Sequence, residues 1–200
     1  SYKLFLGSEP DKEVMRSGLR LPTLSQKNHV LATIGIMGAG KTSHGKVLAE
    51  KLNYQFKDID KEIVLREGMP ITQIFSEKGE PYFRELERDT LQKTFSPDTQ
   101  NILSCGGGIV VNEPNRTLLK ENALVLWLYA TPEAIIKWVN ISKRPLLQCE
   151  NPQEKLRQLL VERKDMYVNT AHVVFSTEKR TKYESTDVLK NEIEKIWGHK

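Results

Sequence analysis

The residues with the clearest chemical potential form a glycine-rich segment at 35–42. It reads G-I-M-G-A-G-K-T and matches the pattern G-x-x-x-x-G-K-[ST]. In such a loop, backbone N–H groups surround phosphate oxygens, the lysine (Lys41) reaches the outer phosphates, and the hydroxyl (Thr42) reaches Mg²⁺. The alternative is a tight glycine turn with an exposed lysine. An apolar run before the segment and an amphipathic pattern after it favour nucleotide binding.

Two carboxylates follow the next expected strand. Asp58 and Asp60 are two residues apart, so on a strand they share one face, at the sheet edge where ligands gather. One carboxylate could orient Mg²⁺ or its water while the other receives a substrate hydroxyl. Solvated turn acids have the same spacing, and spacing alone favours that simpler interpretation.

Alternating strand and helix patterns would position these residues. Apolar runs predict strands at 30–36, 54–60, 101–105, 123–129 and 172–175. Helical periodicity with glycine stops and a Thr131 cap predicts helices at 42–52, 61–67, 71–78, 82–95, 114–121, 132–141, 153–165 and 186–197. Alternation of this kind predicts an α/β fold with a central parallel sheet and helices on both faces.

Length and charge limit the class of protein. The chain has 200 residues, a length that predicts one domain, at 29–200. It carries 30 Lys plus Arg against 26 Asp plus Glu. Residues 1–28 lack periodicity and are expected to form an N-terminal arm outside the core, whose first residues are compatible with an artificial leader. The charges are interleaved, which argues against a nucleic-acid partner.

The apolar runs and the cysteines indicate in which cellular compartment the protein is expected to work. The longest apolar run, 123–130, has eight residues, far below the ~20 that span a bilayer. Cys105 and Cys149 lack metal-ligand spacing, so we expect a reduced, cytoplasmic or organellar setting and no membrane association.

Six motifs in a fixed order extend beyond a generic phosphate loop. They are G-A-G-K-T-S-H-G-K-V-L-A at 38–49, D-I-D at 58–60, I-F-S-E-K-G-E-P-Y-F-R-E-L-E at 74–87, G-G-G at 106–108, R-P-L-L at 144–147 and R-K-D-M-Y at 163–167. Each motif alone is weak, but their order and spacing are specific. Over about residues 30–176 the chain resembles the shikimate kinases.

The resemblance implies a three-layer P-loop kinase fold with a mobile lid at about 143–152. It also implies ATP-dependent phosphorylation of the 3-hydroxyl of shikimate, giving shikimate 3-phosphate and ADP, in the pathway to aromatic amino acids. Mg²⁺ is the implied cofactor. ATP and shikimate are the implied partners, and we expect a cytoplasmic monomer.

The resemblance also assigns roles on the nucleotide side. Asp60 would contact the shikimate hydroxyls and, with Lys41 and Arg144, carry the catalysis. Asp58 would lie beside Mg²⁺ through water, and Thr42 would bind the ion. The implied ATP-binding residues are Gly38, Ala39, Gly40, Lys41, Thr42, Ser43 and the lid residue Arg144.

On the substrate side, Arg84 and Arg163 would grip the shikimate carboxylate, and Gly107 would meet the substrate through its backbone. Glu87 would hold Arg84, while Phe75 and Phe83 would line the ring. Simpler interpretations exist: an i,i+3 surface pair for Arg84 and Glu87, worth a few tenths of a kcal/mol, a solvated Arg163, and ordinary core phenylalanines. Only the match to the ordered family motifs favours the functional roles of these residues.

Two departures and two alternatives accompany the match. Lys137 stands where the family often has an arginine on the adenine side, and an ammonium does not replace a stacked guanidinium. The arm at 1–28 has no counterpart, and His44 is expected to be solvated and without a role. A gluconate kinase that shares the loop and lid is one alternative. A related protein that binds without catalysing is the other.

Overall fold

The computed structural model describes residues 4–6, 29–95 and 100–198. Six strands form one sheet in the order β1-β6-β5-β2-β4-β3, and every neighbouring pair is parallel. The strands are β1 Leu4–Leu6, β2 His29–Ile34, β3 Gln55–Asp58, β4 Gln100–Ser104, β5 Leu124–Tyr129 and β6 Val173–Ser176. All the carboxyl ends therefore meet at one edge of the sheet.

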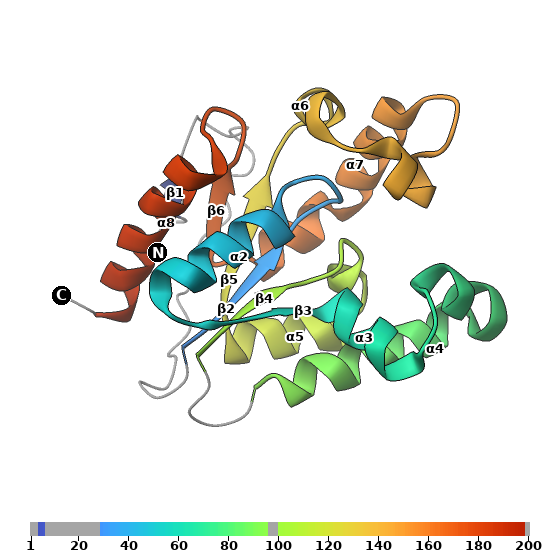
Figure 1. The fold of residues 1–200 in the computed structure, drawn as a ribbon, viewed down its shortest axis with the longest axis horizontal. Coiled ribbons are helices and arrows are strands. Elements are labelled where there is room, and N and C mark those ends of the chain that lie inside the picture. Colours follow the sequence, from blue (N-terminus) through green and yellow to red (C-terminus); the bar gives the residue numbers. More distant parts are fainter. Residues whose placement is uncertain (1–3, 7–28, 96–99, 199–200) are drawn as a thin grey trace.

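Helices cover both faces of this sheet, as the sequence predicted (Figure 1). They are α2 Lys41–Leu52, α3 Ile59–Glu67, α4 Ile71–Lys93, α5 Glu113–Asn122, α6 Pro132–Trp138, α7 Pro152–Thr170 and α8 Lys182–Trp197. Helices α2 and α8 pack against each other on one face, and α5 packs with α4 and α7 on the other. The expected three-layer arrangement is confirmed.

The core is concentrated on β2 and β5, the two central strands. Val30 to Ile34 and Leu124 to Leu128 are buried without interruption, because helices cover both sides of each strand and leave no solvent face. The buried Thr33 hydroxyl donates to the Leu103 carbonyl at 3.0 Å. This satisfies the polar group that would otherwise be costly in the core.

Helix ends follow the predicted signals. Gly68 ends α3 in the left-handed region, and the Thr131 hydroxyl accepts the Ala134 N–H at the start of α6. Gly79, with φ 79° and ψ 170°, interrupts α4 where the sequence placed a stop. The result is a bend in α4 between two helical halves.

Other elements have different bounds from those expected. Helix α6 ends three residues earlier than expected, and α7 continues to Thr170. The segment expected to be a lid, about 143–152, begins at the end of one short 3₁₀ turn, Ile141–Lys143, and contains a second, Pro145–Leu147. Leu4–Leu6 forms an edge strand beside β6 that the sequence did not predict. The remainder of the expected arm, 1–3 and 7–28, lies outside the described residues.

In the described part of the chain, no helix has both the length and the apolar character needed to cross a membrane.

The central position of β2 generates a prediction about stability. Leu31→Ala removes a side chain that is 0% exposed and should lower the free energy of unfolding by about 2–5 kcal/mol through the cavity it leaves. Leu65→Ala, at a side chain 78% exposed, is the matched control and should change it by less than about 0.5 kcal/mol. Urea denaturation of both variants measures the difference, and equal losses would contradict this account of the core.

Candidate active site

The phosphate loop connects the carboxyl end of β2 to the start of α2, as predicted. Gly40 precedes the helix with φ 93°, a conformation that favours glycine. A Cβ there would also lie only 2.6 Å from the His44 ring. The Ala39 N–H donates to the Ile36 carbonyl at 3.3 Å, and the Ser43 hydroxyl donates to the Gly40 carbonyl at 2.9 Å. The expected ATP contacts Gly38 to Ser43 thus form one continuous turn at a helix N-terminus.

Lys41 folds back onto its own loop. Its Nζ donates to the carbonyls of Gly35 at 2.8 Å and Ile36 at 3.0 Å. Burial lowers the pKa of Lys41 to about 8, although the carboxylates of Asp60 and Asp58 oppose the shift. A buried cation without a directly bonded anion is costly, so this lysine is suited to receive a phosphate.

His44 differs from its prediction. The ring is buried, and its Nδ1 lies 2.9 Å from the Gly40 carbonyl. A carbonyl only accepts hydrogen bonds, so Nδ1 carries the hydrogen. Burial lowers the pKa of His44, so the expected solvated side chain is instead a buried support of the phosphate loop.

Three oxygen-bearing side chains meet below the loop. The Thr42 hydroxyl donates to Asp58 at 3.0 Å and lies 3.1 Å from the Ser104 hydroxyl. The other Asp58 oxygen accepts the Lys61 N–H at 3.3 Å, which caps α3. Among the described residues no group of three or more His, Cys, Asp and Glu side chains could hold a metal ion. A site of one carboxylate and hydroxyls, completed by phosphates, is the kind that Mg²⁺ uses.

Asp60 is not on a strand. Strand β3 ends at Asp58, and Asp60 lies in the first turn of α3, so the prediction that both acids share one strand face is wrong. The local reason is that Asp58 caps the helix and ends the strand two residues early. The two acids still interact, because burial and the charge of Asp58 both raise the pKa of Asp60. Lys41 and Arg144 oppose that rise.

The triple glycine follows β4 and gathers side chains from three helices. A Cβ at Gly106 would lie 2.6 Å from an Asp60 oxygen, so only glycine admits the carboxylate. The Gly107 carbonyl accepts Arg163 Nη1 at 3.0 Å and the Tyr167 hydroxyl at 2.6 Å. The Gly108 carbonyl accepts Arg84 Nη1 at 3.3 Å. Arg84 and Arg163, the two arginines predicted to bind the substrate carboxylate, therefore donate to adjacent carbonyls of one loop.

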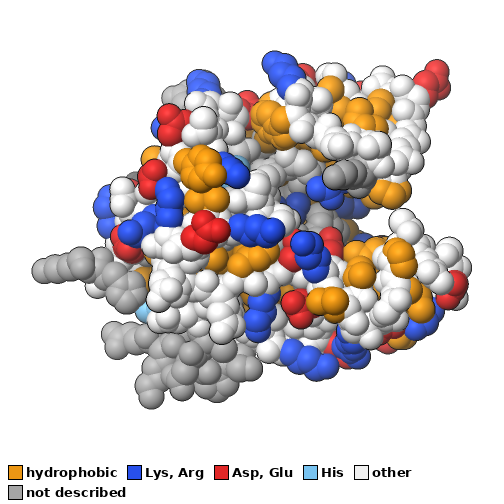
Figure 2. Space-filling view, in the orientation of Figure 1, with side chains coloured by type: hydrophobic (Ala, Val, Ile, Leu, Met, Phe, Trp, Pro, Cys, Tyr) orange, Lys and Arg blue, Asp and Glu red, His pale blue; other side chains and the backbone are white. Residues whose placement is uncertain are grey.

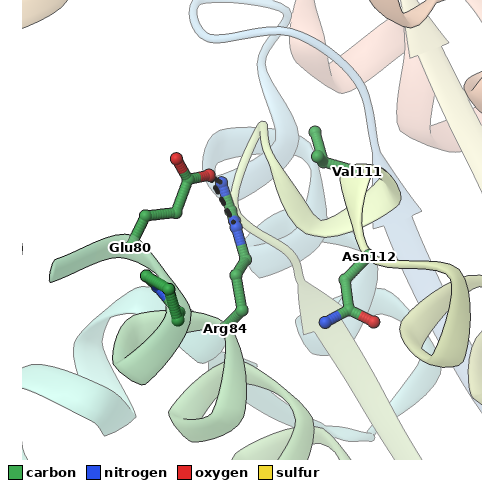
Figure 3. A pocket seen from close by; sticks show the side chains of 5 residues that line it. Glu80, Arg84, Val111 and Asn112 are labelled. Atoms are coloured by element: carbon green, nitrogen blue, oxygen red, sulfur yellow. Dashed lines mark hydrogen bonds and ion pairs between the residues drawn. The ribbon is translucent and has the colours of Figure 1, made fainter.

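Arg84 is fixed by two carboxylates of different exposure, of which Figure 3 shows Glu80. Its Nη1 donates at 2.5 Å to Glu87, whose side chain is only 1% exposed. Burial raises the pKa of Glu87, and the guanidinium of Arg84 opposes this. Glu80, one turn earlier on α4, also bonds Arg84 and is exposed to solvent. The expected pairing of Glu87 with Arg84 is present, and it is buried rather than a surface pair.

The segment expected to form the lid, and the end of α6 before it, contribute Arg144 and Trp138. Arg144 is exposed on the segment between the two 3₁₀ turns, and its charge acts on both Lys41 and Asp60. Trp138 at the end of α6 donates its indole N–H to the Gly38 carbonyl at 2.8 Å. Lys137, beside it, is exposed.

The two phenylalanines expected to line the substrate ring, Phe75 and Phe83, pack together with ring centroids 4.7 Å apart.

Figure 2 shows a hollow between the part of the molecule that carries α6 and α7 and the part that carries α3 and α4, with basic side chains along it. Sequence reasoning missed Ser104, Tyr167 and Glu80. Tyr167 had a signal, because it lies one helical turn after Arg163 in a quoted motif. The glycine loop brings together the phosphate loop, a carboxylate of raised pKa (Asp60) and two guanidinium groups. This combination is suited to moving a phosphoryl group onto a hydroxyl of an anionic molecule.

Comparison with known proteins agrees with this geometry. The sequence model of the family described as shikimate kinase matches residues 37–194. A shikimate kinase of Sulfurihydrogenibium sp. is 43% identical over 149 residues, covering 74% of this chain and 87% of that protein. A shikimate kinase of Thermodesulfovibrio yellowstonii is 37% identical over 171 residues, covering 85% and 96%.

A solved structure gives the same result for the fold. The shikimate kinase from Acinetobacter baumannii in complex with shikimate is similar with a TM-score of 0.75 and 36% identity, covering 88% of this chain and 96% of that one. The family model spans Gly38 to Ser43, the glycine loop and both arginines, and the relatives match at high identity and coverage, so the chain belongs to the shikimate kinase family.

Proposed function

We propose that this protein is a shikimate kinase that transfers the terminal phosphoryl group of ATP to the 3-hydroxyl of shikimate, releasing shikimate 3-phosphate and ADP. One observation carries the proposal: Arg84 and Arg163 bond adjacent carbonyls of the glycine loop, against which Asp60 also lies. A carboxylate ligand between these arginines would hold its hydroxyls near Asp60. The family membership of the chain supports the same reaction.

Substrate recognition follows from charge and shape. Two guanidinium groups suit one small carboxylate, and each charge-assisted hydrogen bond contributes about 1.5–3 kcal/mol. Phe83, packed against Phe75 and 5.5 Å from the Arg84 guanidinium, supplies an apolar side for the ring. Gly107, without a side chain, leaves its backbone accessible to the substrate.

Phosphoryl transfer needs positioning and charge neutralisation more than covalent help. In the proposed reaction Asp60 accepts the hydrogen bond of the attacking hydroxyl and directs it at the terminal phosphate. Lys41 leaves the loop carbonyls for the phosphates, and Arg144 covers them from the lid. Closure of the lid would exclude water, which otherwise competes for the phosphoryl group.

The cluster below the loop fits a magnesium ion. Thr42 would bind it directly and Asp58 through water, while Ser104 lies close enough to the Thr42 hydroxyl to orient it. When bound, Mg²⁺ supplies positive charge to the phosphate oxygens. The oxygen atoms of these side chains are hard donors, which bind Mg²⁺ in preference to softer metal ions.

The alternatives receive less support. A gluconate kinase acts on an acyclic sugar acid, whereas two arginines on one loop and paired phenylalanines favour a cyclic carboxylate. A binder without activity would be expected to have lost a catalytic group, but Lys41, Thr42, Asp58, Asp60 and Arg144 are all present.

Assembly and location belong to the same proposal. The large hydrophobic side chains that are exposed lie on different elements, including Leu65 on α3, Val161 on α7 and Tyr183 on α8. Apolar residues scattered in this way support a monomer. Cys105 and Cys149 are free thiols, which supports work in the reducing cytoplasm, where ATP is available.

Turnover tests the proposal directly. Purified protein should convert shikimate and ATP with Mg²⁺ to shikimate 3-phosphate and ADP, while gluconate under the same conditions should give no product. Rapid turnover of gluconate in place of shikimate would select the alternative kinase, and turnover of neither would favour a binder.

The lowered pKa of Lys41 predicts proton uptake on nucleotide binding. With a pKa of about 8, Lys41 is about half protonated at pH 8, and bound phosphates should raise its pKa and draw in about half a proton. Calorimetry of ATP binding in buffers of different ionisation enthalpy measures the uptake. It should vanish in Lys41→Arg, which is always charged, and persist in the exposed-lysine control Lys46→Arg. Absence of uptake in the parent protein would contradict the prediction.

Asp60 predicts both a rate and a pH profile. Asp60→Asn, nearly isosteric, should lower kcat by ~10²-fold or more, the scale of a positioned acid–base group. Because the pKa of Asp60 is raised, its carboxylate form is lost as pH falls through that raised value. The parent should therefore lose activity at a higher pH than an ordinary aspartate predicts. A variant Asp60→Asn with near-parental turnover, beside an inactive Asp58→Asn, would assign the chemistry to Asp58 instead.

Arg163 predicts selective loss of substrate affinity. Arg163→Ala removes one guanidinium from the carboxylate and should weaken shikimate binding by roughly tenfold to a hundredfold. ATP affinity should be unchanged. Arg157→Ala, at an exposed arginine of the same helix that pairs with Glu133 and Glu154, is the matched control. Titration calorimetry with each ligand decides, and equal weakening of both ligands would remove Arg163 from the carboxylate site.

A further inference from the structure

The hydrogen bonds of Arg84 leave little room for a substrate carboxylate. Nη1 donates to Glu87 and to the Gly108 carbonyl, while Nε and Nη2 donate to one Glu80 oxygen at 3.1 and 2.8 Å. A guanidinium has five N–H groups, so these bonds leave one. A carboxylate bound through two parallel N–H groups needs a pair of them. One of the present partners must therefore leave when such a ligand binds.

The three partners differ in how easily they can leave. Glu87 is 1% exposed and would have to stay charged in a buried position without its partner. The Gly108 carbonyl belongs to the backbone of the glycine loop. Glu80 is 57% exposed, so water can solvate its carboxylate as soon as it lets go. Glu80 is the partner that can be exchanged at low cost.

The position of Glu80 also suits exchange. It holds the Nε and Nη2 edge, which is an edge that carboxylates take in paired hydrogen bonds with arginine. It directly follows the Gly79 bend, and a cavity of about 330 Å³ lined by Glu80, Pro81, Arg84, Val111 and Asn112 adjoins the pair (Figure 3). The released side chain thus has space beside the arginine.

We propose that Glu80 is an internal stand-in for the substrate carboxylate: it holds Arg84 in its binding pose while the site is empty and is displaced when the substrate carboxylate binds. This inference rests on the proposed function for the identity of the substrate. Glu80 is a positioning residue that acts through Arg84. An ordinary surface ion pair would have no effect on substrate binding, and a permanent support of Arg84 would strengthen it.

The test compares Glu80→Gln with the parent by calorimetric titration. Removing the internal competitor should tighten shikimate binding about two- to fivefold, the scale of an exposed ion pair. KM for shikimate should fall with kcat and KM for ATP unchanged. The methyl ester of shikimate, which lacks the negative charge, should bind both proteins equally. Glu77→Gln is the matched control, since Glu77 lies on the same helix and bonds Gln73 instead of Arg84.

A second ligand separates this inference from the proposed function. Cyclohexanecarboxylate carries a ring and a carboxylate without the hydroxyls, and it too should bind Glu80→Gln more tightly than the parent. If shikimate neither binds nor turns over but this probe still distinguishes the two proteins, the proposed function fails and the role of Glu80 stands. Equal affinity of parent and variant for the probe, weaker binding by the variant, or no binding to either would overturn the role of Glu80.

Discussion

The carbonyl oxygens of Gly107 and Gly108 organise the proposed substrate side of the molecule. Arg163 and Tyr167 from α7 reach the first, and Arg84 from α4 reaches the second. The loop can be approached this closely because it has no side chains: a Cβ at Gly108 would lie 2.8 Å from Arg84 Nη2. The guanidinium groups of two helices that are distant in the sequence are thereby held on adjacent carbonyls of one loop.

The phosphate loop and the acids near it depend on a different compromise. Lys41 is half-buried, and its hydrogen bonds go to neutral carbonyls of its own loop. Burial lowers the pKa of this lysine and raises those of Asp60 and Glu87. In each case the charged form is less stable than in water. The fold accepts this cost in the hollow where a charged ligand would relieve it.

Short-range sequence patterns made much of the fold and of the site predictable. The phosphate loop, the Gly68 and Gly79 stops and the Thr131 cap depend on residues within a few positions of each other, and all were read correctly from the sequence. Asp60 was misplaced because β3 is short and Asp58 caps α3, and periodicity does not register where such a strand ends. His44 was misjudged because its burial comes from tertiary packing. The partners of Gly107 required contacts across some sixty positions, beyond the range of any local pattern.

The hydrogen bond from Trp138 to Gly38 has a consequence for observing this protein. Of its three tryptophans, Trp127 is buried in the central sheet and Trp197 stacks on His29 at the opposite edge. Trp138 donates its indole N–H to the phosphate loop, and it is 48% exposed. Its indole is therefore a natural optical label for that loop. Trp127 also lies against this loop, at Gly35, but it is buried. The exposed Trp138 is therefore the indole whose fluorescence can follow the entry of a ligand without any dye attached.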